Sequence, residues 1–298
     1  MADSQSACPV LMNTQAGAIH EFSGPEQLQR MAGEAGFELD IRQTHSVEEM
    51  QEQLRQLVQE GAPRVAVAGG DGTVEIAVQI VAHTNTALGI LSQGTFNNFA
   101  SALRLPHNLP AALGVLHTGR ICAVDLGCVN GRYFTESAGI GLFADGLSLY
   151  GEGTNKNFLR GLYTLARLAL AFRPCEAEIV VDGEPHQARV TLCEVTNTYR
   201  IAQAVPIAPE ADVDDGYLDV VLLQDIERHE LLEYLKALRA QMHLGLPKVK
   251  VLRARREVRI ATHRRRRNVH ADDTVVGVTP VQITVEAGAL KVLVPDKP

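Results

Sequence analysis

The residues best suited to chemistry lie in a glycine-rich turn. An apolar run at residues 65–68 predicts a short buried strand, and Gly-Gly-Asp-Gly-Thr follows it at residues 69–73. Glycines let the backbone approach a phosphate group, and the helix that follows offers free N–H groups at its N-terminus. Asp71 would repel a phosphate, so we expect it to act through Mg²⁺ or a hydroxyl group. The pattern favours phosphate binding, and a tight turn without a ligand is the alternative.

A second candidate loop follows the next apolar strand, which we expect at residues 87–91. Its sequence is Ser-Gln-Gly-Thr-Phe-Asn-Asn-Phe-Ala, at residues 92–100. Loops that follow neighbouring parallel strands lie at the same edge of a sheet, where α/β proteins bind ligands. We therefore expect both loops to belong to one ligand site.

The segments around these loops alternate between strand and helix. Ser23-Gly24-Pro25-Glu26 and Ser46-Val47-Glu48-Glu49 are typical of helix capping boxes. Strands without polar alternation are predicted at residues 9–12, 37–41, 65–68 and 87–91. Such strands, separated by helices, indicate a parallel sheet covered on both faces. We predict an α/β domain over residues 1–124.

After about residue 120 the pattern becomes mostly antiparallel β. Asn130-Gly131 and Asp182-Gly183 are typical of hairpin turns. Further strands are predicted at residues 217–223 and 278–285, and helices only at residues 157–172 and 226–242. We predict a second, β-sandwich domain over residues 125–285, with a last strand, about residues 286–298, that returns to the first domain.

The composition is that of a globular protein in a reducing compartment. The chain has 298 residues, of which 46% are hydrophobic and 21% charged, and a formal net charge of −7. This excludes a largely disordered chain and disfavours one that coats nucleic acid. Its five cysteines include no Cys-x-x-Cys pair, which disfavours a disulfide framework or a zinc site. No signal peptide or membrane-spanning run is recognised, so we expect a cytoplasmic protein.

The two loops together resemble the diacylglycerol kinase catalytic domain, the family of bacterial lipid kinases, diacylglycerol kinases and sphingosine kinases. The family pattern is Gly-Gly-Asp-Gly-Thr, then a strand, then Gly-Thr-x-Asn-Asp-Phe-Ala. Residues 69–73 match fully, and residues 94–100 match except for Asn98, where aspartate is usual. Further similarities follow in the family's order over nearly the whole chain, at residues 10–17, 124–127, 137–141, 209–219, 279–280 and 293–295.

The resemblance implies a fold, a reaction and site residues. The fold is an NAD kinase- or phosphofructokinase-like nucleotide-binding domain followed by a β-rich lipid-substrate domain. The reaction is transfer of the γ-phosphate of ATP, with Mg²⁺, to a lipid hydroxyl, diacylglycerol-like or sphingoid. A lipid substrate implies transient contact of a peripheral protein with a membrane surface. The implied nucleotide-binding residues are Asn13, Thr44, Gly69, Gly70, Asp71, Gly72, Thr73, Gly94 and Thr95.

The family's Asp-Gly-Glu turn, just before Thr-Pro, implies a catalytic base. That spacing reaches Asp272-Asp273-Thr274, so Asp272 is the candidate base, and Thr274 replaces the glutamate. Asp71, near the phosphates and their Mg²⁺, is the second candidate catalytic residue. A literal Asp-Gly-Glu begins at Asp182, but strands of alternating pattern flank it and favour a plain hairpin turn.

An acidic loop at residues 212–219 is the candidate metal site, because clustered carboxylates and carbonyls suit Mg²⁺ or Ca²⁺. It holds Asp212, Asp214, Asp215 and Asp219. The resemblance implies a structural Mg²⁺ at Asp215, with the carbonyl groups of Asp212 and Tyr217. A solvated acidic turn is the alternative.

Basic residues gather between Lys248 and Arg267, with ten Lys and Arg against one acid, Glu257. No aromatic residues interleave with them, which disfavours nucleic acid as a partner. A solvated strand face and contact with anionic lipid headgroups are the two remaining interpretations. The apolar segment 158–172 is either a buried helix or a second lipid-facing segment.

Two other functions stay open beside the lipid kinase. A soluble small-molecule kinase of NAD kinase type carries a similar glycine turn, although its length and second half fit less completely. A nucleotide-binding sensor without catalysis would account for three departures from the family pattern: Asn98, Thr274, and Glu75-Ile76 where Asn-Glu is usual.

Overall fold

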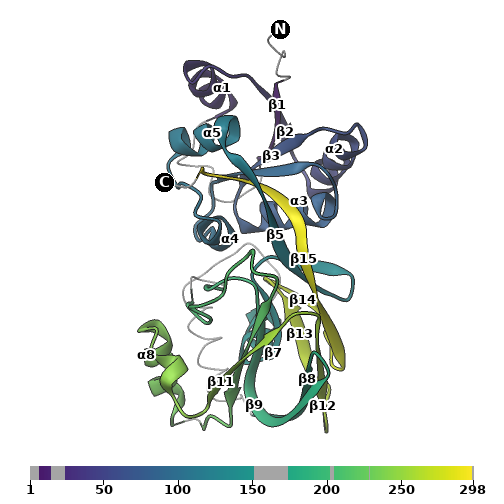
Figure 1. Cartoon of the computed structure of the whole chain (residues 1–298), viewed down its shortest axis with the longest axis vertical. Helices are drawn as coiled ribbons and strands as arrows, with labels where there is room; N and C mark the ends of the chain where they lie inside the picture. Colours follow the sequence, from purple (N-terminus) through teal and green to yellow (C-terminus); the bar gives the residue numbers. More distant parts are fainter. Residues whose placement is uncertain (1–6, 15–23, 151–173, 202–204, 228, 297–298) are drawn as a thin grey trace. The chain divides into compact units, whose positions relative to one another are not determined.

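A computed structural model describes residues 7–14, 24–150, 174–201, 205–227 and 229–296 (Figure 1). These residues form two units: unit 1 is Met1–Val124 with Gly288–Pro298, and unit 2 is Asp125–Ala287. Three predicted features lie outside the described residues: the Ser23 helix cap, residues 15–17 of the first motif, and the helix at residues 157–172.

Unit 1 is built on a parallel sheet in the strand order β2–β1–β3–β4–β15. The strands are β1 (Cys8–Asn13), β2 (Leu39–Thr44), β3 (Arg64–Gly69), β4 (Ala87–Ser92) and the end of β15 (Val281–Val294). Because β3 and β4 are buried almost throughout, both faces of the sheet must be covered. The predicted parallel sheet is confirmed.

Helices cover the two faces of this sheet. They are α1 (Pro25–Glu34), α2 (Val47–Gln59), α3 (Asp71–Val81), α4 (Asn98–Ala102) and α5 (Leu109–Thr118). The helix α1 contacts α5, and α2 contacts α3, so each pair lies on one face (Figure 1). The predicted cap of α2 is confirmed, because Ser46 Oγ accepts a hydrogen bond from Glu49 N at 3.1 Å.

Unit 2 is an antiparallel β structure in the order β14–β13–β7–β9–β8–β12–β15, with β10 beside β9 and β11 beside β10. The elements are β5 (Arg120–Val129), β6 (Arg132–Phe134), β7 (Ser137–Gly141), α6 (Leu142–Tyr150), β8 (Cys175–Val181), β9 (Glu184–Thr196), β10 (Leu218–Gln224), α8 (Leu231–Arg239), the 3₁₀ turn η2 (His243–Gly245), β11 (Val249–Ala254), β12 (Glu257–Thr262), β13 (Asn268–Ala271) and β14 (Thr274–Val278). Both predicted hairpins occur: Asn130 and Asp182 have φ angles of 52° and 50°, and the glycine after each is also left-handed.

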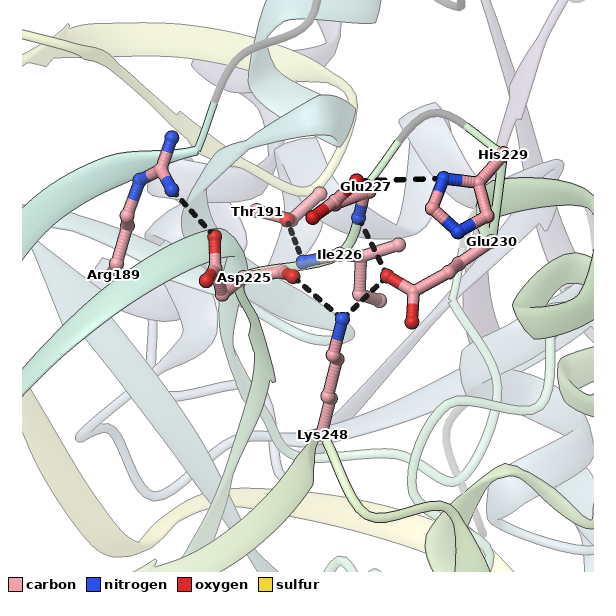
Figure 2. Close-up of polar contacts among 8 residues, drawn as sticks. All are labelled: Arg189, Thr191, Asp225, Ile226, Glu227, His229, Glu230 and Lys248. Carbon is pink, nitrogen blue, oxygen red and sulfur yellow. Dashed lines mark hydrogen bonds and ion pairs between the residues drawn. The ribbon is translucent and has the colours of Figure 1, made fainter.

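The helix predicted at residues 226–242 is shorter than expected, and a polar cluster shows why (Figure 2). The N–H of Ile226 donates to Thr191 Oγ1, 3.2 Å away, and the N–H of Glu227 donates to Glu230. Lys248 donates to the carbonyl of Asp225 and pairs with Glu230. These bonds hold residues 225–227 outside a helix, so α8 begins only at Leu231.

The final strand also differs from the prediction. Residues 278–285 and 286–298 were expected as two strands, but β15 is a single strand, Val281–Val294. It begins in unit 2 and ends in unit 1. Strands β13 and β14 were not predicted, because with four and five residues they are too short to show an alternation. The basic run, for which a solvated strand face was one interpretation, contains β11 and β12.

Candidate functional sites

The two glycine loops of unit 1 are joined directly. The N–H of Gln93 donates to the carbonyl of Gly69 at 2.8 Å, and the N–H of Asn97 donates to Asp71 Oδ2 at 2.9 Å. Asn97 is left-handed, with φ of 49°, and its side chain also bonds both backbone groups of Gly94. Asp71 therefore ties the start of α3 to the loop after β4. Asn97 had no role in the sequence analysis, although the motif contains it.

Three of the glycines are required by packing within the protein. A Cβ atom on Gly69 would lie 2.3 Å from Thr73 Oγ1. A Cβ on Gly70 would lie 3.0 Å from the Cα of Gly94, and one on Gly94 would lie 2.6 Å from the Cα of Gly70. The two loops thus approach each other backbone to backbone, which only glycine permits.

Gly72 is different, because nothing in unit 1 requires a glycine there. It is exposed in the first turn of α3, its φ is not left-handed, and no heavy atom lies within 4 Å of an added Cβ. No side chain caps the N-terminus of α3. Two buried polar atoms at the adjoining end of β4, Ser92 Oγ and Gln93 Nε2, have no hydrogen-bond partner. The open space and the uncapped helix N–H groups fit a bound anionic group such as a phosphate.

The remaining nucleotide candidates occupy different environments. Asn13 and Thr44 are register partners at the carboxyl ends of β1 and β2. Thr44 is fully buried and donates to the carbonyl of Met12 at 3.3 Å, and Thr73 is buried against Gly69. Thr95 is exposed on the second loop. All four lie at the same edge of the sheet as the glycine turn, but the hydroxyl of Thr44 is bonded within the protein and the side chain of Thr73 is buried.

Asp272, in the β13–β14 turn of unit 2, is surrounded by hydrogen-bond donors. Its Oδ1 accepts from the N–H groups of Glu136 (2.8 Å) and Ser137 (3.2 Å). Its Oδ2 accepts from Thr135 N (3.0 Å) and Thr135 Oγ1 (3.2 Å). The carboxylate thereby holds the β6–β7 turn, and its lone pairs are fully used.

The electrostatics of Asp272 favour proton uptake. Burial raises the pKa of the Asp272 carboxyl, and the four hydrogen bonds oppose this without cancelling it. Of the four donors, only the Thr135 hydroxyl can rotate away and free a lone pair on Oδ2. No sequence pattern marks Thr135, because it reaches Asp272 only through the pairing of β7 with β13.

Asp182 is the structural counterpart of Asp272. It too is left-handed, and its carboxylate accepts the N–H groups of Arg255, Arg256 and Glu257 at 2.7–2.9 Å. These bonds lower the pKa of Asp182 although burial acts to raise it. The two aspartates therefore hold neighbouring turns in the same way but differ in the direction of their pKa shifts.

The acidic loop has a counter-ion on strand β11, the guanidinium group of Arg253. Asp215 accepts from Tyr217 N at 3.0 Å and pairs with Arg253, whose Nε lies 3.5 Å from Asp219. The Arg253 guanidinium also lies over the Tyr217 ring, 4.3 Å from its centroid. Burial raises the pKa of Asp219 to about 6. Within the described residues, no group of three or more His, Cys, Asp or Glu side chains could hold a metal ion. The carboxylates of Asp215 and Asp219 thus have Arg253 as their counter-ion, and the Mg²⁺ expected at Asp215, with the carbonyl groups of Asp212 and Tyr217, stays a prediction.

Asp125 fixes the same loop from the start of unit 2. It is buried, it accepts the N–H of Gly216 at 2.6 Å, and its own N–H donates to Val213 O at 2.7 Å. In the sequence, Asp125 is marked only as part of the segment at residues 124–127 that is similar to the family.

Comparisons with known proteins agree with both units. The chain matches the family model for the diacylglycerol kinase catalytic domain at residues 8–129 and that for the YegS C-terminal NAD kinase beta sandwich-like domain at residues 154–294. A diacylglycerol kinase of Mycobacterium tuberculosis (strain ATCC 25618 / H37Rv) is 32% identical over 254 residues, which cover 81% of this chain and 80% of the relative. That of Staphylococcus carnosus (strain TM300) is 28% identical over 243 residues, covering 76% and 78%.

A solved structure of a diacylglycerol kinase from Bacillus anthracis str. Sterne has the same fold, with a TM-score of 0.72 at 20% identity over 97% of this chain and 96% of that one. Fold and glycine turn define a two-domain kinase of the NAD kinase-like class. Within that class, the chain belongs to the diacylglycerol kinase family. No helix among the described residues is long and apolar enough to cross a membrane.

Asp215→Asn should lower the Tm by up to about 3 °C, because it weakens the ion pair with Arg253, and such partly exposed pairs contribute about 0–1 kcal/mol. Since the counter-ion is an arginine, the loss should be equal in excess Mg²⁺ and in EDTA, as measured by thermal unfolding. If Mg²⁺ raises the Tm of the parent protein but not that of the variant, the acidic loop is instead a Mg²⁺ site.

Proposed function

We propose that the protein is an ATP-dependent kinase that transfers the γ-phosphate to the hydroxyl group of a lipid of the diacylglycerol type. The observation that carries the proposal is the open first turn of α3, where a Cβ atom on Gly72 would meet no heavy atom within 4 Å and no side chain caps the helix N-terminus. The relatives named diacylglycerol kinase support the lipid as acceptor.

In this proposal the glycine turn holds the phosphates of ATP. The N–H groups at the start of α3 donate to phosphate oxygens, while Asn13, Thr44 and Thr95 shape the same edge of the sheet. Asp71 keeps the two loops together through Asn97. Mg²⁺, which enters with ATP, neutralises the phosphate charge during transfer.

Asp272 receives the proton of the acceptor hydroxyl. The oxygen of the lipid hydroxyl forms a bond to the γ-phosphorus, the bond from that phosphorus to the β–γ bridging oxygen breaks, and ADP leaves. As the Thr135 hydroxyl rotates away from Oδ2, this oxygen accepts the proton that the lipid hydroxyl loses. The pKa of Asp272 is raised by burial, so its carboxylate takes up a proton more readily, which supports this role.

We further propose that the protein is peripheral and contacts the cytoplasmic side of a membrane. Three consecutive arginines, Arg264 to Arg266, are exposed in the loop between β12 and β13, and Thr262 Oγ1 fixes this loop by donating to the carbonyl of Arg265 at 2.8 Å. Exposed arginines of this kind attract anionic lipid headgroups.

Incubation of the purified protein with labelled ATP, Mg²⁺ and a panel of lipid extracts tests the reaction itself. Label in the lipid phase supports the proposal. Label transferred only to a soluble acceptor such as NAD would favour a small-molecule kinase, and ATP binding without transfer would favour a sensor.

Gly72→Ala should leave the fold intact and weaken ATP binding about tenfold or more, because the new methyl group occupies the space of the phosphate. Alanine in a helix should keep or slightly raise the Tm. Gly33→Ala, at an equally open position in α1, is the matched control and should bind ATP like the parent. If the two variants bind ATP with equal affinity in a titration, the proposal that this turn binds phosphate is wrong.

Asp272→Asn should cut turnover by about 10²–10⁴-fold with nearly unchanged ATP affinity, since the amide cannot accept the proton. Asp182→Asn is the matched control, because it removes a carboxylate that holds a turn in the same way. Both variants should lose Tm, but only the first should lose turnover. The reverse pattern would make Asp182 the base, and full activity of both would exclude either carboxylate.

A further inference from the structure

A buried ion pair lies beneath the Asp272 turn, and the proposed reaction does not use it. His270 of β13 and Glu194 of β9 are both 0% exposed, and His270 Nε2 lies 3.0 and 2.9 Å from the two carboxylate oxygens of Glu194. Such pairs add little net stability, because removing two charges from water offsets their attraction. Such a pair can instead fix the positions of the groups around it.

The two side chains can meet because the strand between them carries a glycine. Gly139 of β7 pairs with Glu194 on one side and with His270 on the other. A Cβ on Gly139 would lie 2.8 Å from the carboxyl group of Glu194. Phe143 packs against the His270 ring, with the ring centroids 5.0 Å apart. The pair therefore occupies a site shaped for it.

The other ring nitrogen of His270 reaches the turn. Nδ1 lies 3.0 Å from the carbonyl oxygen of Asp272, and because a carbonyl only accepts, Nδ1 carries a proton. Burial lowers the pKa of His270, but the Glu194 carboxylate and Asp272 together raise it by more, so the net pKa is above its usual value. With Nδ1 protonated and Nε2 facing Glu194, both ring nitrogens are engaged and the ring has one orientation.

We propose that His270, oriented by Glu194, is a positioning residue for Asp272, and this inference rests on the function proposed above. The bond from Nδ1–H fixes the peptide of Asp272, which has a left-handed φ of 48° that an L residue rarely adopts. With its backbone fixed, the Asp272 carboxylate faces Thr135, Glu136 and Ser137. One chain of hydrogen bonds thus runs from β9 to the β6–β7 turn.

Two substitutions distinguish the effect of the hydrogen bond from His270 Nδ1 to the Asp272 carbonyl from the effect of the charge on the His270–Glu194 pair. In His270→Gln the amide nitrogen takes the place of Nε2 and keeps Glu194, but nothing donates to the Asp272 carbonyl. In Glu194→Gln the charge disappears, while a neutral His270 still donates from Nδ1 and accepts from the glutamine amide through Nε2. Phosphorylation of dioctanoylglycerol in micelles gives kcat and KM, and ¹⁵N NMR of the His270 ring reports its hydrogen bonds without reference to activity.

We expect His270→Gln to lower kcat about 10–100-fold with KM for ATP nearly unchanged, since a displaced catalytic group costs this much. Glu194→Gln should keep a kcat close to that of the parent. If His270→Gln does not fold, two double variants without the buried charge replace it. One is Glu194→Gln/His270→Gln, and the other is Glu194→Gln/His270→Asn. The asparagine amide lies where Nδ1 was, so only the glutamine version should lose kcat.

Parent-like kcat of folded His270→Gln, or an equal loss in Glu194→Gln, would overturn the positioning role. So would NMR signals that show His270 Nδ1 without a proton. If Asp272→Asn keeps full activity, Asp272 is not the base, and the proposed function fails. This outcome differs from one in which only the positioning role of His270 fails, because Asp272→Asn would then still lose turnover.

Discussion

Hydrogen bonds from backbone N–H groups to aspartate carboxylates are the constraint on which unit 2 depends. Its hairpins end in short turns whose N–H groups have no partner in the sheet, and buried N–H groups must be bonded. Asp272 meets this need for the β6–β7 turn, and Asp182 meets it for the β11–β12 turn. Asp125 does so for the acidic loop through Gly216. Asp272, which we propose as the catalytic base, thus also has a structural task.

Unit 1 satisfies a different constraint with glycine. Gly70 and Gly94 bring two loops into backbone contact, while Gly72 leaves the first turn of α3 open. The same short motif thus contains glycines that the fold requires and one that only a ligand would require. This distinction supports the proposed phosphate site over a tight turn without a ligand, and residue type alone does not reveal it.

Much of the fold could be predicted from the sequence, because buried parallel strands and Asn-Gly or Asp-Gly turns have strong local signals. The parallel sheet, the α2 cap and both hairpins were predicted in this way. The relation of Thr135 to Asp272 and of His270 to Glu194 could not be, since each depends on strand register between distant segments. Arg253 was counted only as part of a basic run, although its partners lie in the acidic loop.

The strand β15 has a consequence for how the chain is made. Leu290 and Val292 are fully buried, and Val292 pairs with Leu88 of β4, so the first unit takes a core strand from the last residues of the sequence. During synthesis from the N-terminus, the parallel sheet therefore keeps an unpaired edge at β4 until the ribosome has finished the whole of unit 2. Unpaired edges of this kind invite aggregation. Unit 1 is the first to be translated, but it cannot complete its sheet before the whole of unit 2 has been made.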